Sequence, residues 1–159
     1  MKRLALALLL AASPVSARES LGVFSGWGAF RDDVPLRCFA IAQPMGRSEG
    51  AWRPFAAVSH WPRQRVRSQL HIRLSRERKQ GAPLALMIDD RRFPLISGGA
   101  DAWAPDPRFD AAIVAAMRSG RVMSVATVAT SGERFADTYR LKGAATAIDA
   151  AALGCAQVR

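Results

Sequence analysis

Turn-forming residues interrupt the apolar segments of this 159-residue chain about every ten residues between Val23 and Ile96. Short apolar segments at this spacing are typical of antiparallel strands that form a sandwich or a barrel. The sequence therefore predicts a mainly β fold. The expected strands are Val23–Phe30, Leu36–Ala42, Arg53–Trp61, Val66–Ser75, Leu84–Ile88 and Arg92–Ile96.

The clearest periodic signal lies in Val66–Ser75. The apolar residues Val66, Leu70, Ile72 and Leu74 fall on one parity of the segment, and the polar residues Arg67, Gln69, His71 and Arg73 fall on the other. A strand with one buried and one wet face requires this alternation.

One amphipathic helix is expected over residues 107–119. Asp106 suits the N-cap, Pro107 the first helical position, and Gly120 the position just past the end. Apolar residues recur at helical spacing: Phe109, Ala112, Ile113, Ala116 and Met117.

The remaining segments predict a hairpin and a short C-terminal helix. Arg121–Ala129 and Arg134–Leu141 are expected to pair across a short loop that contains Gly132. Ala144–Leu153 is Ala-rich and is expected to form the helix.

The first 17 residues have the layout of a secretory signal peptide. Lys2 and Arg3 precede the nine apolar residues of Leu4–Ala12, and small residues then lead to Ala17, after which we expect cleavage. Nine apolar residues are fewer than the roughly 20 that span a bilayer, so we prefer export to a membrane anchor. Residues 18–159 are predicted to form one domain in the periplasm or outside the cell, with no transmembrane segment.

The chain has two cysteines, Cys38 and Cys155, and both follow the predicted cleavage site. An even number of cysteines in an oxidising compartment predicts a disulfide between them. Two unrelated buried thiols are the alternative.

The strongest candidate for a binding site is a basic segment. The net charge is +10, and seven basic residues within residues 63–79 accompany a single acid, Glu77. On the predicted strand, Arg65, Arg67 and Arg73 share one face with Gln69 and His71. We predict that Arg65, Arg67, His71, Arg73 and Arg76 bind an anionic envelope component, either lipopolysaccharide or anionic lipid.

The basic segment also has alternative interpretations. In one of them, a GC-rich genome accounts for the arginines at the outer positions of the strand, and the strand is solvated and binds no ligand. Nucleic acid is the weaker choice of partner, because residues 65–81 contain no aromatic side chain for base stacking.

Catalytic motifs are missing from the sequence. It has no phosphate-binding glycine loop, no H-E-x-x-H pattern and no G-x-S-x-G elbow. His60 and His71 are the only histidines, and Asp89 and Asp90 are interpreted as turn residues. We expect no catalytic residue, metal or cofactor, and we interpret Trp27, Trp52, Trp61 and Trp103 as core or strand-end anchors rather than the lining of a sugar or lipid pocket.

Several short stretches resemble the invasion-associated locus B family of exported bacterial proteins. They are residues 26–30 (GWGAF), 37–41 (RCFAI), 69–74 (QLHIRL), 93–95 (FPL), 113–120 (IVAAMRSG) and 141–144 (LKGA). The resemblance implies a secreted or periplasmic β-sandwich without known catalytic residues, in a family whose named members are linked to host-cell entry. Members usually carry further cysteines before the helix, whereas residues 97–104 contain none here.

Together these features predict a non-enzymatic, exported, envelope-associated binding protein. Two alternatives stay open: a small periplasmic hydrolase centred on His60 or His71, and an adaptor that binds another envelope protein.

Overall fold

The computed structural model describes residues 18–46 and 53–156. The predicted signal peptide, residues 1–17, and Trp52 lie outside the described residues. Along the described part of the chain, the elements follow one another as eleven strands, a 3-10 turn and two α-helices. Their bounds are β1 Glu19–Phe24, β2 Trp27–Asp33, β3 Leu36–Ala42, β4 Phe55–Trp61, η1 Pro62–Gln64, β5 Val66–Arg73, β6 Ala85–Ile88, β7 Arg91–Phe93, β8 Ile96–Gly98, β9 Asp101–Trp103, α1 Pro107–Ser119, β10 Val122–Val128, β11 Arg134–Arg140 and α2 Ala144–Ala156.

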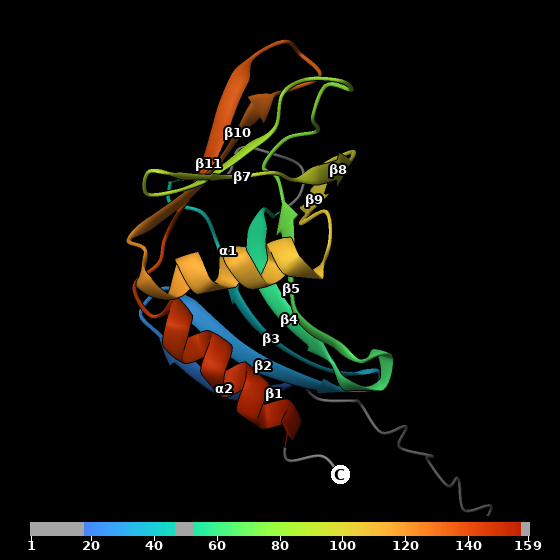
Figure 1. Cartoon of the computed structure of the whole chain (residues 1–159), viewed down its shortest axis with the longest axis vertical. Coiled ribbons are helices and arrows are strands. Elements are labelled where there is room, and N and C mark those ends of the chain that lie inside the picture. The colour runs from blue at the N-terminus through green and yellow to red at the C-terminus, as the bar shows by residue number, and fades with distance from the viewer. Residues whose placement is uncertain (1–17, 47–52, 157–159) are drawn as a thin grey trace, which may run out of the picture.

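The strands form two antiparallel sheets, which confirms the predicted mainly β fold. The larger sheet has the order β1-β2-β3-β4-β5-β9-β8, and the smaller has the order β11-β10-β6-β7. Both helices cover one face of the larger sheet, and the smaller sheet lies above it in Figure 1. Within the described residues the strands do not close into a barrel.

The main core lies between the larger sheet and the two helices. Inward-facing strand residues such as Trp27, Val58 and Ile72 are fully buried there, as are Ile113 of α1 and Ile148 of α2. The indole Nε1 of Trp27 donates a hydrogen bond to the carbonyl oxygen of Arg140 at 2.8 Å, so a strand of the larger sheet is tied to β11.

The predicted bounds of α1 are confirmed. The Asp106 carboxylate accepts hydrogen bonds from the backbone N–H groups of Arg108 and Phe109, as an N-cap does. Gly120 ends the helix in an extended conformation rather than a left-handed one. A Cβ at this position would lie 2.7 Å from Ile88 Cγ2, so close packing requires the glycine.

Three details of the prediction are wrong. The expected strand Val23–Phe30 is two strands, because Ser25 and Gly26 form a tight turn and Phe24 pairs with Trp27. The expected strand Arg92–Ile96 is likewise divided between β7 and β8. In α1, Phe109 is exposed and Asp110 is buried, since the helix turns its carboxylate toward β5.

Candidate functional site

A β-bulge in β5 divides the basic segment between two faces of the larger sheet. Ser59 pairs with Gln69 and Trp61 pairs with Val66, so Arg67 and Ser68 together oppose His60. Ser68 has a φ of 56°, in the left-handed region. A bulge shifts the alternation of side chains by one position. The expected single stripe of arginines is therefore wrong, and Arg67 lies beside His60 on the side of α2.

His71 and Arg73 lie on the face of the larger sheet that the helices leave open. Asp101 accepts hydrogen bonds from His71 Nε2 at 2.7 Å and from two nitrogens of Arg73 at 3.0 and 2.9 Å. Partial burial works to raise the pKa of Asp101, but the hydrogen bonds from Arg73 and His71 outweigh it and lower that pKa. The His71 ring also stacks on Trp103 and meets Phe55 edge-on. This part of the basic segment is already partnered within the protein.

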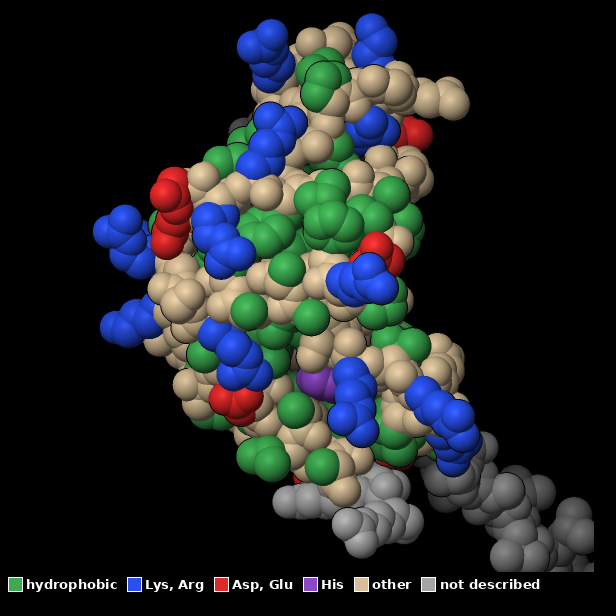
Figure 2. Space-filling model, viewed as in Figure 1, with side chains coloured by type: hydrophobic (Ala, Val, Ile, Leu, Met, Phe, Trp, Pro, Cys, Tyr) green, Lys and Arg blue, Asp and Glu red, His purple; other side chains and the backbone are tan. Residues whose placement is uncertain are grey.

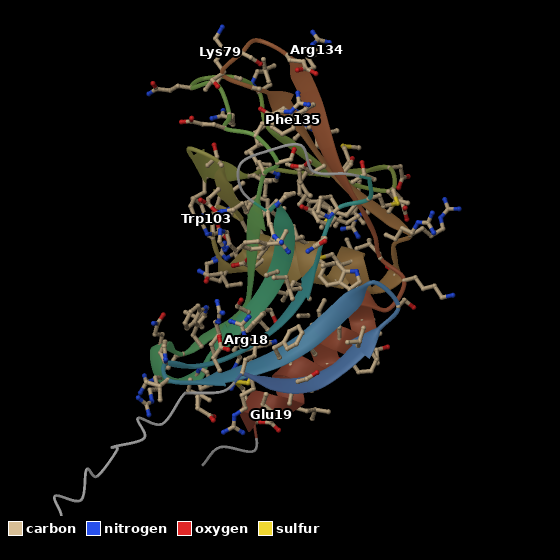
Figure 3. All side chains as sticks on the ribbon, turned by 180° about the vertical axis from the view of Figure 1, so that it is seen from behind. Arg18, Glu19, Lys79, Trp103, Arg134 and Phe135 are labelled. Carbon is tan, nitrogen blue, oxygen red and sulfur yellow. A yellow bond between two sulfur atoms is a disulfide. The ribbon has the colours of Figure 1, made fainter. Side chains whose placement is uncertain are left out.

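Arg76 belongs to a third place in the fold. Its guanidinium lies 2.6 Å from Glu133 and 5.8 Å from the ring centroid of Phe135, beside the β10–β11 hairpin. Figure 3 shows Phe135, and with it this hairpin, near one end of the molecule. The five predicted binding residues therefore do not form one site. Their role in binding stays a prediction.

Arg65 and Arg67 line a pocket where the β4–β5 connection meets the end of α2. The 3-10 turn η1 continues into Arg65, whose backbone is left-handed and whose N–H donates to the Pro62 carbonyl at 3.1 Å. The pocket has a volume of about 780 Å³. Its lining comes from two segments, His60, Pro62, Arg65, Val66, Arg67 and Ser68 on one side and Ala152, Leu153, Cys155 and Ala156 on the other.

A disulfide fixes the α2 side of this pocket. Cys155 of α2 is bonded to Cys38 of β3, 117 residues earlier, and this confirms the predicted bridge. Cys38 is paired in the sheet with His60 of β4, which lines the same pocket. The bridge therefore holds the end of α2 next to the β4–β5 connection.

Three arginines in and next to the β4–β5 connection have no acidic partner among the described residues. Arg63, Arg65 and Arg67 are all exposed, and no ion pair in the described part of the chain includes them. By contrast, Asp32 pairs with both Arg18 and Arg37 at 2.8 Å. We call residues 62–68 the basic turn. In Figure 2, seen from the helix side, basic side chains flank a histidine in the lower part of the molecule.

His60 is the only histidine in this pocket, and it is 8% exposed. Its Nδ1 accepts a hydrogen bond from the Ser68 backbone N–H at 3.3 Å, and its Nε2 has no hydrogen-bond partner among the described residues. Burial lowers the pKa of His60, and the charges of Arg67 and Arg118 lower it further. The ring is therefore neutral at neutral pH, and the positive charge of the pocket comes from the arginines.

The described residues hold no arrangement typical of the hydrolase alternative. Neither His60 nor His71 is hydrogen-bonded to a serine or cysteine side chain there. Nor do these residues include a group of three or more His, Cys, Asp or Glu placed to hold a metal ion. The absence of an enzymatic activity stays a prediction.

The prediction from the sequence left out Arg63, which belongs to the basic turn but does not line the pocket. It also left out Leu153, which lines the pocket and was assigned only to a helix. The disulfide prediction contained the useful signal, because a bond from Cys155 to β3 brings the end of α2 next to the strand that precedes the basic turn.

Comparison with known proteins identifies the family of the chain. A family model described as "Invasion associated locus B (IalB) protein" matches residues 37–152, a range that contains the basic turn and most of α2. No curated protein and no solved structure matches the chain. The IalB family is extracellular or periplasmic, and the Cys38–Cys155 disulfide fits that location. Because the match covers the bulk of its length, the chain belongs to the invasion associated locus B (IalB) family.

Proposed function

We propose that this protein is a non-enzymatic, exported, envelope-associated binding protein whose basic turn contacts the phosphates of anionic envelope lipids. The observation that carries the proposal is the set of three exposed arginines without an acidic partner among the described residues. Guanidinium groups bind phosphate with bidentate hydrogen bonds. Unneutralised arginines close together also raise the local positive potential, which attracts anionic surfaces.

Exposed apolar side chains lie at the same end of the molecule. The antiparallel register places the β2–β3 turn and the basic turn at one end of the larger sheet. Val34 in the β2–β3 turn is 78% exposed, and Leu153 near the end of α2 is 63% exposed. Apolar side chains beside basic ones are typical of proteins that lie on a membrane surface, because the two attractions add.

No helix among the described residues has the length and hydrophobicity needed to cross a membrane. The proposed contact is made by turns at the membrane surface.

The proposal is tested by vesicle co-sedimentation of the purified protein. We expect binding to phosphatidylcholine vesicles that contain phosphatidylglycerol, weaker binding at high ionic strength, and little binding to phosphatidylcholine alone. Vesicles that contain lipopolysaccharide distinguish the two sources of phosphate. Failure to bind either anionic vesicle at low ionic strength would overturn the proposal.

A charge-matched pair of variants localises the contact. Each basic residue near an anionic surface contributes about 1 kcal/mol, so Arg63→Gln with Arg65→Gln is expected to weaken vesicle binding about thirtyfold. Arg91→Gln with Arg92→Gln removes the same charge from exposed positions on β7, in the other sheet. If both double variants lose binding equally, the attraction comes from net charge and the basic turn has no special role.

A further inference from the structure

We infer that the pocket between the basic turn and α2 binds a single-chain anionic amphiphile, with its acyl chain in the pocket and its charged head at Arg65 and Arg67. The inference rests on the proposed function, because the basic turn supplies the charge in both. It adds a defined cavity, a ligand class and a site for the apolar part of that ligand.

The pocket has the size and lining of a ligand site. Its volume of about 780 Å³ lies within the range of about 300–1,000 Å³ typical of small-molecule pockets. Ala152 and Ala156 have small side chains, so the α2 wall leaves open space beside the apolar surfaces of Val66 and Leu153. Leu153 is 63% exposed, and covering it with an acyl chain would remove this apolar surface from water.

The charge of the lining selects an anionic head. Arg65 and Arg67 are exposed at the pocket, and no Asp or Glu among the described residues lines it. In the described part of the lining the other titratable group is His60, which burial keeps neutral. Arg118 also faces His60, but its guanidinium is paired with Asp149 at 2.6 Å. Among the described residues, the cations of the pocket without an acidic partner are therefore these two arginines, and guanidinium groups bind a carboxylate or a phosphate monoester.

Both walls of the pocket are held in place without a ligand. The Cys38–Cys155 disulfide fixes the end of α2, and the hydrogen bond from the Ser68 N–H to His60 fixes the bulge. A preformed site loses little conformational entropy when the ligand binds, so most of the contact energy is available for affinity.

The test is calorimetric titration of the purified protein with palmitate below its micellar concentration. Hexadecanol and hexadecyltrimethylammonium serve as neutral and cationic ligands with the same chain. We expect palmitate to bind at a stoichiometry of one and at least tenfold more tightly than either. Dodecyl phosphate tests whether a phosphate head replaces the carboxylate.

Two variants separate the pocket from the membrane surface. Ala152→Trp fills the pocket and is expected to weaken palmitate binding at least tenfold, without loss of binding to anionic vesicles. Ala115→Trp places the same side chain on the exposed face of α1 and is the matched control. Should Ala152→Trp fail to fold, Arg67→Gln is expected to weaken palmitate binding and leave hexadecanol binding unchanged.

The two proposals fail in different ways. No measurable palmitate binding, or equal binding by the folded Ala152→Trp variant, overturns the pocket inference even when vesicle binding persists. Equal affinity for all three head groups also overturns it, because the arginines then select nothing. Loss of vesicle binding alone overturns only the proposed function.

Discussion

The arginines of this protein are not equivalent, although the sequence places many of them close together. Arg73 is held by two hydrogen bonds to Asp101, so its charge is largely neutralised inside the protein. Arg37 pairs with Asp32 and lies over the rings of Phe39 and Trp61. An arginine that already has a carboxylate partner gives up that partner when it binds a ligand, which costs affinity. For this reason the candidate contact is the basic turn, whose arginines have no acidic partner in the part of the chain that the structure describes, rather than the whole basic segment.

His60 makes the stability of the protein sensitive to acid. Burial, Arg67 and Arg118 lower its pKa below the ordinary value of about 6.5, so the unfolded chain binds the proton more readily than the folded one. Stability is therefore lost as the pH falls below about 6.5. We expect the melting temperature of the wild type to fall more between neutral pH and about pH 5 than that of His60→Gln.

The matched control for this prediction is His71→Gln, which retains His60 and is expected to keep the acid sensitivity. An identical pH dependence of the melting temperature in the wild type and His60→Gln would contradict the assignment.

At the scale of elements, Asp110 joins α1 to the larger sheet. Its carboxylate accepts a hydrogen bond from the Leu70 backbone N–H at 2.7 Å, and burial raises its pKa. Asp110→Ala leaves that buried N–H without its acceptor and is expected to lower the free energy of unfolding by about 1–3 kcal/mol. Asp110→Asn keeps an acceptor and carries no buried charge, so at neutral pH we expect it to be at least as stable as the wild type.

Denaturant unfolding at two pH values checks this prediction. A carboxyl group whose pKa is raised on folding contributes most to the free energy of unfolding at low pH. This contribution is lost as the pH rises through the pKa of the group in the folded protein. The stability of Asp110→Asn relative to the wild type should therefore grow with pH. A difference in the free energy of unfolding that is the same at both pH values would show that ionisation of Asp110 plays no part.

Local signals predicted the elements well where neighbours in the sequence determine them. Asp106 caps α1 by accepting hydrogen bonds from backbone N–H groups two and three residues away, so the first turn of α1 could be predicted from the sequence. The bulge at Ser68 could not be predicted, because it depends on pairing with His60 across the sheet. The pairing of Arg73 with Asp101 likewise depends on β9 lying next to β5. The expected stripe of arginines on one strand face was wrong because of the bulge, whereas the role of these residues in binding stays a prediction.

At the scale of the whole molecule, the disulfide closes nearly the entire described chain. It joins residues 117 positions apart, and a loop of this length gives a large entropic stabilisation by restricting the unfolded chain. We expect Cys38→Ala with Cys155→Ala to lower the free energy of unfolding by about 2–5 kcal/mol, as measured by denaturant unfolding. The reduced wild type should match the double variant, and equal stability of the oxidised and reduced proteins would contradict the prediction.

The proposed contact with an anionic lipid surface lies at the end of the molecule formed by the basic turn and the end of α2. Hydrogen–deuterium exchange with and without phosphatidylglycerol vesicles tests this contact. We predict slower exchange in residues 62–68 and in the last turn of α2, with no change in β6 and β7. Protection confined to the open face around His71 and Trp103, or no protection anywhere, would contradict it.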